Sequence, residues 1–217
     1  MHSETTGRWT PVAISKDVME NTVMPAQIEA GSIALWRSAS GRMAASADRC
    51  PHRGMRLSHG FVRGEALSCI YHGWSYAQAG HCLRIPAHPG LEPPETIRVA
   101  TYAVEERGGI IWVASYRPEG EPPFFDGLIP LRSLTATASI GVIEAAVGQA
   151  ADSNGLLKFS RGTTTAFLLL SEQGRARTLI HVLLEMSAGA AAGIAASRAV
   201  ESLRRAAEKR QAEGFTS

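Results

Sequence analysis

The chain has 217 residues, of which 45% are hydrophobic and 19% are charged, as is ordinary for a soluble protein with one large domain or two modest ones. Its formal net charge is only +2, and acidic and basic residues are interspersed along the chain. This balance excludes an electrostatic basis for binding nucleic acid or an anionic membrane surface.

The chain contains only three cysteines. An odd, low count argues against a disulfide framework and favours a reducing compartment. Residues 1–18 show no basic segment followed by an apolar core, so we expect no signal peptide. No apolar run approaches the ~18 residues that span a bilayer. We therefore expect a cytoplasmic protein without membrane contact.

Short β-strand signals separated by turns fill the region from residue 8 to about residue 120. Strands are predicted at 32–38, within 65–86 on both sides of a turn at Gly80, at 96–106 and at 109–116. Many short strands at regular spacing predict an all-β domain over residues 1–120, built from small antiparallel barrels or a sandwich.

A segment rich in proline and glycine follows these strands. Residues 117–130 hold four prolines and two glycines, residues that interrupt regular structure. We therefore predict that residues 121–130 connect the first domain to a second, small α+β domain over residues 131–217.

Two elements are predicted in the second domain. A β-hairpin is expected at 163–186, with its turn near Gly174. Ser187 is expected to N-cap a helix that runs to about Gln211. One face of this helix is apolar and must pack on another element; it is formed by Ala196, Val200, Leu203 and Ala207.

Two pairs, each of one cysteine and one histidine, form the main chemical motif. They are Cys50-x-His52 and Cys69-x-x-His72, and each pair is followed by a glycine. Such residues could hold a structural zinc ion, or the four could be unrelated. The mixed pairs favour a Rieske 2Fe-2S cluster, in which two thiolates bind one iron and two imidazoles bind the other. The glycines would let backbone N–H groups approach the cluster closely.

The stretches "CPHRG", "CIYHGW" and "GHCLRIP" resemble the Rieske domain of the Rieske-type non-haem iron oxygenases, and the likeness extends over about residues 8–117. The resemblance implies that Cys50 and Cys69 bind the inner iron. It implies equally that His52 and His72 bind the outer iron near the surface. The second domain is then expected to be a shortened helix-grip fold of the START-like kind.

Three positions separate this sequence from the respiratory Rieske proteins, which carry an extra cysteine in each cluster loop and a serine after the second glycine. Here those positions hold Met55, Tyr71 and Trp74. Fewer dipoles near the sulfur atoms favour a reduction potential toward the low end of the Rieske range of about −150 to +300 mV. Such a potential suits electrons from an NAD(P)H-fed reductase or a ferredoxin.

Other residues near the motif have plainer expected roles. Arg53 is expected to pair with an acid rather than to guide a partner, and Trp74 is expected to form a packing wall. Cys82 is expected to be a small buried hydrophobic residue. The nearby histidines without pair spacing are expected at the surface or in turns, and they are His59, His81 and His88.

In the oxygenase family, the cluster supplies electrons to a mononuclear iron, held by two histidines and one carboxylate in the frame Asn-x-x-Asp-x-x-His-x-x-x-x-His. The stretch "QAADSNGLLKFSRG" fits this frame, with Gln149 and Asp152 at its first two positions. However, Gly155 and Ser160 stand at the two histidine positions, and neither is a good ligand for iron.

The histidine count leads to the same expectation. His181 is the only histidine after residue 88, and one histidine cannot make a two-histidine site. We expect His181 to be a cross-strand polar residue. The expected cofactor is therefore the 2Fe-2S cluster alone, without a mononuclear iron.

These features predict a protein that carries single electrons from a reductase or ferredoxin to a full-length Rieske oxygenase, and that does not oxygenate a substrate alone. The alternatives are an iron-lacking subunit of a mixed Rieske oxygenase, which implies a hetero-oligomer, and a redox-sensing or structural relic. A self-sufficient oxygenase would need iron ligands that the sequence does not offer. A homo-oligomer is also compatible with the apolar helix face.

Overall fold

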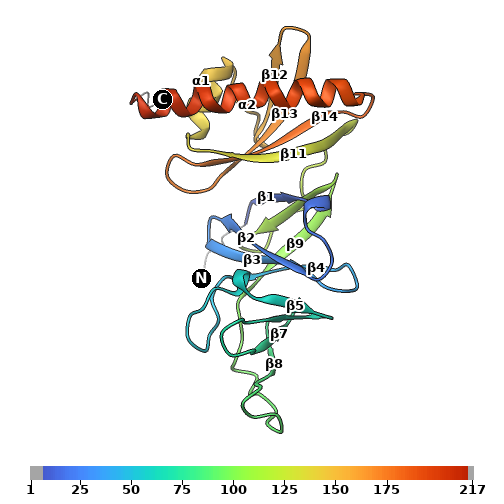
Figure 1. Ribbon diagram of the computed structural model, residues 1–217, viewed down its shortest axis with the longest axis vertical. Helices are drawn as coiled ribbons and strands as arrows, with labels where there is room; N and C mark the ends of the chain where they lie inside the picture. Colours follow the sequence, from blue (N-terminus) through green and yellow to red (C-terminus); the bar gives the residue numbers. More distant parts are fainter. Residues whose placement is uncertain (1–6, 215–217) are drawn as a thin grey trace. The chain divides into compact units, whose positions relative to one another are not determined.

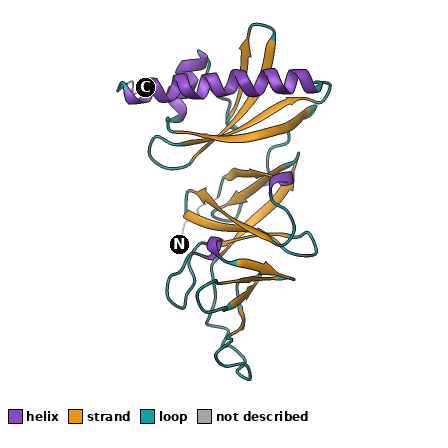
Figure 2. Cartoon of the chain, viewed as in Figure 1, coloured by secondary structure: helices purple, strands orange, loops and turns teal. Residues whose placement is uncertain are grey.

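The computed structural model describes residues 7–214, so the outermost residues of both predicted domains, 1–6 and 215–217, lie outside the described part. The chain forms two compact units and passes from the first to the second between Pro122 and Pro123. Two short segments, Pro11–Ile14 and Arg107–Ile110, cluster with the second unit. Figure 1 follows the chain by colour, and Figure 2 separates helices from strands.

The first unit is built of β-strands, with two short 3-10 helices at Ser15–Asp17 and Leu57–His59. Its larger sheet has six strands in the order β1 (Trp9–Ile14), β10 (Ile110–Ala114), β9 (Thr101–Arg107), β4 (Met43–Ala47), β3 (Gly31–Arg37) and β2 (Thr22–Ile28). Its smaller sheet has four strands in the order β5 (Phe61–Arg63), β6 (Ala66–Ser68), β7 (Ser75–Ala77) and β8 (Cys82–Arg84). The predicted all-β architecture is confirmed.

Two predicted strands of this unit differ from the structure. The stretch 65–86 is interrupted by a loop from Cys69 to Trp74, between β6 and β7. The strand predicted at 96–106 begins only at Thr101. Before it, the chain meets the end of the small sheet through single hydrogen bonds, such as the Cys82 N–H to the Ile97 carbonyl at 3.0 Å, rather than through a ladder.

The second unit is a four-stranded antiparallel sheet with two helices. The sheet order is β11 (Leu128–Ala136), β14 (Thr178–Glu185), β13 (Thr164–Glu172) and β12 (Leu156–Arg161), and the helices are α1 (Ile140–Val147) and α2 (Ala190–Ala212). The predicted hairpin is confirmed as β13 and β14, and Gly174 takes a φ of 100° in its turn. Strand β11 starts at Leu128, so residues 128–130 of the predicted connection are strand.

The long helix α2 packs its apolar face on the sheet, as predicted. All four residues of the predicted face are buried in the core of this unit: Ala196, Val200, Leu203 and Ala207. The helix starts later than expected, because its N-cap is Gly189 and not Ser187. The Ala188 N–H bonds the Glu185 carbonyl at 2.8 Å, which places Ser187 in a turn before the helix.

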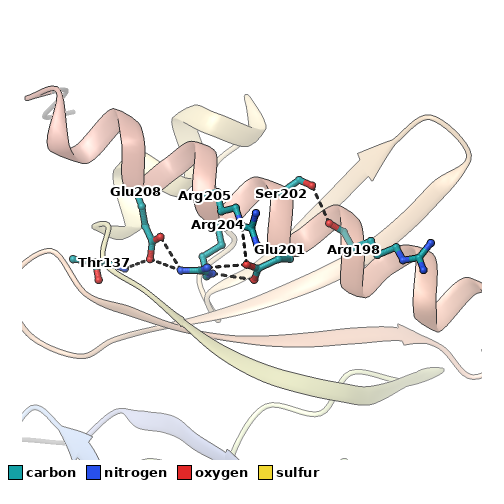
Figure 3. Close-up of polar contacts among 7 residues, drawn as sticks. All are labelled: Thr137, Arg198, Glu201, Ser202, Arg204, Arg205 and Glu208. Atoms are coloured by element: carbon teal, nitrogen blue, oxygen red, sulfur yellow. Dashed lines mark hydrogen bonds and ion pairs between the residues drawn. The ribbon is translucent and has the colours of Figure 1, made fainter.

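The polar face of α2 carries a charged network, drawn in Figure 3. Arg204 bonds Glu201 and Glu208, both at 2.7 Å. Glu208 also accepts a 2.9 Å hydrogen bond from the backbone N–H of Thr137, just after β11. This hydrogen bond links the charged network of the helix to the segment that follows β11. Within residues 7–214, neither helix has the length and apolar character needed to cross a membrane.

Candidate metal centre

The first Cys-His pair lies on a loop that follows β4. The N–H of Cys50 donates to the carbonyl of Met55 at 2.8 Å, and the N–H of Gly54 donates to the carbonyl of Cys50 at 2.8 Å. Gly54 has a φ of 73°, a left-handed conformation that glycine adopts without a steric penalty. These bonds turn the backbone around the position where His52 leaves the loop.

The second pair lies on the β6–β7 loop, which repeats the same backbone pattern. Here Cys69 donates to the carbonyl of Trp74 at 2.9 Å, and Gly73 donates to the carbonyl of Cys69 at 2.9 Å. Gly73 has a φ of 68°. In both loops the bonds run from the cysteine to the fifth residue after it, and from the fourth residue back to the cysteine. Two similar loops, inferred from the pairs and their glycines, are therefore present in the fold.

The structure brings the four predicted ligand residues together at these loops. Cys50 and Cys69 are each only 2% exposed, whereas His52 is half-buried and His72 is exposed. The two imidazole rings have their centroids 4.6 Å apart. Thiols in the interior and imidazoles at the surface match the donor set of a Rieske cluster, which needs two thiolates on one iron and two imidazoles on the other.

No group of three or more Cys, His, Asp or Glu side chains within residues 7–214 is arranged to hold a single metal ion. A 2Fe-2S cluster asks for only two protein ligands on each iron. Two thiols and two imidazoles are the number and kind of donors that such a cluster takes.

The surroundings of the sulfur and nitrogen donors are electrostatically distinct. Burial raises the pKa of the Cys69 thiol, and the neighbouring Cys50 sulfur adds to the rise. The backbone N–H groups of Tyr71 and His72 act in the opposite direction, because they stabilise a charged sulfur. The pKa of His52 is lowered mainly by desolvation, and to a smaller extent by the charges of His72 and Arg53. N–H groups thus face the sulfur side, as a cluster requires.

One residue of the centre escaped the sequence analysis. The hydroxyl of Tyr76 lies 3.1 Å from the sulfur of Cys50, and the Tyr76 side chain is 2% exposed. Burial, and then the contact with Cys50, raise the pKa of the Tyr76 hydroxyl, so it remains a hydrogen-bond donor. The sequence feature that could have indicated Tyr76 is its middle position in the three-residue strand "SYA", where it is the one buried residue.

A second missed residue closes the first loop at its base. Asp48 is 7% exposed. Its carboxylate accepts hydrogen bonds from the Ser58 N–H at 2.6 Å and from the Ser58 hydroxyl at 2.7 Å. The ten-residue separation of the partners hides this closure from sequence patterns.

The neighbouring residues confirm some expectations and correct one. Trp74 stacks on His52, with ring centroids 4.3 Å apart and planes 4° apart, which fits a packing role. Cys82 is buried in the core behind the loops, as predicted. Arg53, however, is exposed and makes no ion pair with any residue between 7 and 214. The expectation that it pairs with an acid is wrong.

The residues aligned with the mononuclear iron frame serve ordinary structural purposes. The carboxylate of Asp152 accepts hydrogen bonds from the N–H groups of Asn154 at 2.8 Å and Leu156 at 2.9 Å, which closes a turn. Gly155 has a φ of 82° in that turn, and Ser160 is an exposed residue of β12. His181 is fully buried, with its Nδ1 2.8 Å from the hydroxyl of its cross-strand partner Ser133.

Comparison with known proteins concentrates on the first unit. Residues 8–103 match the model of the Rieske [2Fe-2S] domain. Oxidoreductase NdmD of Pseudomonas putida is 41% identical over 116 residues, which cover 53% of this chain and 20% of that protein. The 4beta-methylsterol monooxygenase of Methylococcus capsulatus is 38% identical over 123 residues, which cover 55% of this chain and 32% of that protein. The chain thus spans between a fifth and a third of these relatives.

Solved structures extend the likeness of the fold to the second unit. NdmA of Pseudomonas putida CBB5, as a mutant with theobromine, superposes with a TM-score of 0.72 at 18% identity, over 92% of this chain and 80% of that one. Dicamba monooxygenase superposes with a TM-score of 0.67 at 18% identity, over 97% of this chain and 90% of that one. At this identity the likeness establishes the fold alone.

Proposed function

We propose, from the match of residues 8–103 to the Rieske [2Fe-2S] domain, that the chain carries single electrons to a non-haem iron oxygenase whose active site lies in another chain. A Rieske cluster supplies one-electron chemistry when it is bound. Cys50 and Cys69 would hold it on the buried side, and His52 and His72 on the exposed side. An outward pair of imidazoles suits exchange of electrons with a docked protein.

The observation that carries this proposal is the contrast between the two units. The first unit gathers a complete donor set for a 2Fe-2S cluster. In the second unit the one histidine among the described residues, His181, is buried against Ser133, and Asp152 is engaged in a turn. Residues 7–214 therefore offer donors for receiving an electron, but their second unit holds no two-histidine site at which to use it.

The test is a reconstitution with purified components. The cluster-loaded protein is added to an NADH-fed reductase and a complete Rieske oxygenase that receives electrons slowly on its own. We expect the rate of product formation to rise with the concentration of this protein. The Cys50→Ser variant should have no effect, because it removes a ligand of the cluster. A turnover rate that never responds to the wild-type protein would reject the proposal.

An iron-lacking subunit of a mixed oxygenase is the second candidate. The domain relatives include proteins named as oxygenase subunits, such as the phenoxybenzoate dioxygenase subunit alpha of Ectopseudomonas oleovorans, 39% identical over 116 residues that cover 52% of this chain and 28% of that protein. Stable co-purification with a complete oxygenase chain would favour this arrangement over a free carrier. A redox sensor would show neither electron delivery nor co-purification.

A further inference from the structure

One edge strand of the second unit differs from the other edge strands. The six-stranded sheet ends in β1 and β2, and the sheet of the second unit ends in β11 and β12. Three of these strands contain a proline, and they are β1 with Pro11, β2 with Pro25 and β11 with Pro130. Proline cannot donate to a neighbouring strand, so it protects an edge from pairing with another chain.

Strand β12 lacks this protection. It contains six residues, Leu156–Arg161, and none of them is proline. The edge strands of the small sheet, β5 and β8, also lack proline, but each has only three residues, and such short edges offer little to pair with. Among the strands of residues 7–214, β12 is therefore the edge that is most open to a partner strand.

Two residues of β12 present unpaired backbone groups at this edge. The N–H of Asp152 donates to the carbonyl of Leu156 at 2.9 Å, and the carboxylate of Asp152 accepts the N–H of Leu156 at 2.9 Å. The backbone groups of Leu156 therefore face away from β13. Since these groups alternate between the two sides of an antiparallel strand, those of Lys158 and Ser160 face the same edge. Within residues 7–214, no other segment hydrogen-bonds to them there.

A second copy of β12 complements this edge. In an antiparallel pair about a two-fold axis, Lys158 of each copy lies opposite Ser160 of the other, and Phe159 lies opposite itself. Each free N–H then meets a free carbonyl of the other copy, so no group is left over. A shift that sets Lys158 opposite itself would bring Ser160 opposite Leu156, whose backbone groups are already bonded to Asp152.

The side chains are compatible with this register. Lys158 meets a serine rather than another cation, and its Nζ lies 6.0 Å from the centroid of the Phe167 ring in its own sheet. Phe159 is 6% exposed and belongs to the core beneath the helices. Opposite residues without hydrogen bonds have Cα atoms about 4.5 Å apart, so the two Phe159 rings meet at the axis and form a favourable cross-strand pair.

We propose that β12 binds β12 of a second copy of this chain, so that the four-stranded sheets of the two second units join edge to edge into one continuous sheet. The helices of both copies then lie on the same face of the joined sheet, because opposite residues of a strand pair share a face. A two-fold contact is closed, so assembly stops at two copies. Main-chain hydrogen bonds and one aromatic pair make this a reversible dimer that depends on concentration. The dimer does not rest on electron delivery.

Analytical ultracentrifugation of the cluster-loaded chain at several concentrations tests both the pairing and its register. The wild type should show a monomer–dimer equilibrium. Ser160→Lys places a cation opposite Lys158 at two symmetric points and should raise the dimer dissociation constant about 5-fold or more. Ser160→Asp places an anion there and should lower the constant. Lys158→Glu combined with Ser160→Lys restores opposite charges and should return the constant to the wild-type value or below it.

A proline variant and matched charge changes elsewhere complete the test. Lys158→Pro removes an N–H that its own sheet does not use, so it should abolish the dimer and keep the far-ultraviolet circular dichroism of the wild type. Ser187→Lys and Ser187→Asp make the same charge changes on an exposed serine before α2 and should leave the dissociation constant unchanged. A wild type that stays monomeric at every concentration overturns the pairing. Equal dissociation constants in Ser160→Lys and Ser160→Asp overturn it as well.

Discussion

Cys50 is a buried ligand residue and His72 is an exposed one, whereas Cys82 is a nearby cysteine that is not expected to bind the cluster. Substitution of either ligand residue should therefore differ in its effect from substitution of Cys82. Cys50→Ser removes a buried sulfur and His72→Ala removes a surface imidazole, so each should abolish the visible spectrum of the cluster. Cys82→Ser should preserve it, although Cys82 is buried in the same core. Absorption spectroscopy after anaerobic reconstitution provides the measurement. Loss of the spectrum in Cys82→Ser alone would show that the ligands have been assigned wrongly.

The hydroxyl of Tyr76 should tune the reduction potential without binding iron. Its hydrogen bond to the Cys50 sulfur stabilises the reduced cluster more than the oxidised one, because reduction adds negative charge near the sulfur. A differential of about 1 kcal/mol corresponds to about 40 mV for one electron, so Tyr76→Phe should lower the potential by roughly that amount. Protein-film voltammetry measures it.

Tyr116→Phe is the matched control for this prediction, since Tyr116 is 51% exposed and makes no contact with the cysteines. Its potential should equal that of the wild type. A potential that rises or stays constant in Tyr76→Phe would mean that the hydroxyl does not donate to a cluster-bound sulfur.

At the scale of elements, the two matched loops depend on glycine to different degrees. A methyl group on Gly73 would lie 3.0 Å from the ring of Pro86, whereas one on Gly54 would meet the flexible side chain of Arg49. Both glycines have a left-handed φ, 68° at Gly73 and 73° at Gly54, so the backbone penalty for a side chain is shared and the contact with Pro86 makes the difference. Gly73→Ala should therefore reduce iron incorporation more than Gly54→Ala.

Gly64→Ala controls for the backbone penalty alone. Gly64 has a φ of 57°, and nothing lies within 4 Å of the added methyl position. Iron content per chain, measured by a colorimetric iron assay, should follow the order Gly64→Ala, Gly54→Ala, Gly73→Ala from highest to lowest. Equal iron contents would mean that close packing over the second loop does not matter for cluster binding.

The sequence predicts those elements whose signal is local. The spacing of cysteine, histidine and glycine predicted two similar loops, because backbone turns and metal donors both lie within a few residues of one another. The apolar repeat of α2 likewise predicted its buried face. In contrast, the contact between Tyr76 and Cys50 joins residues 26 positions apart, and that between Asp48 and Ser58 closes a loop only in three dimensions.

Helix α1 and strand β12 of the second unit were not predicted from the sequence, for a different reason. Helix α1 has only eight residues, which gives an apolar repeat little length to stand out. It is stabilised largely by packing of Val142 and Ile143 in the core. The edge strand β12 lies within residues 149–162, the stretch that was compared with an iron-binding frame. Ser139, whose hydroxyl accepts the N–H of Val142 at 3.4 Å, was the local signal for the start of α1.

At the scale of the whole molecule, His181 should make the second unit sensitive to acid. Burial lowers the pKa of His181 to about 4, while the backbone of Pro11 acts in the opposite direction. Nε2 of His181 makes no hydrogen bond with the described residues. In the unfolded chain the pKa is about 6.5. Below that value the unfolded state binds a proton that the folded state excludes, so stability falls from about pH 6.5 to about pH 4, by up to ~3 kcal/mol.

Urea unfolding followed by far-ultraviolet circular dichroism measures this loss, because both α-helices among residues 7–214 lie in the second unit. His181→Gln keeps a polar partner for Ser133 but does not titrate, so its midpoint should change less between pH 7 and about pH 5. His88→Gln, at an exposed position, should retain the wild-type response. A wild-type midpoint that is constant over this range would exclude a buried neutral His181.

The account as a whole depends on one cluster per chain, held by two cysteines and two histidines. Iron and acid-labile sulfide per chain, determined together with electron paramagnetic resonance of the reduced protein, test this most directly. We predict two irons and two sulfides per chain and a single spin-half signal of the Rieske type. Bound zinc with no iron would contradict the cluster itself, and a third iron per chain would contradict the view that oxygen chemistry takes place in another chain.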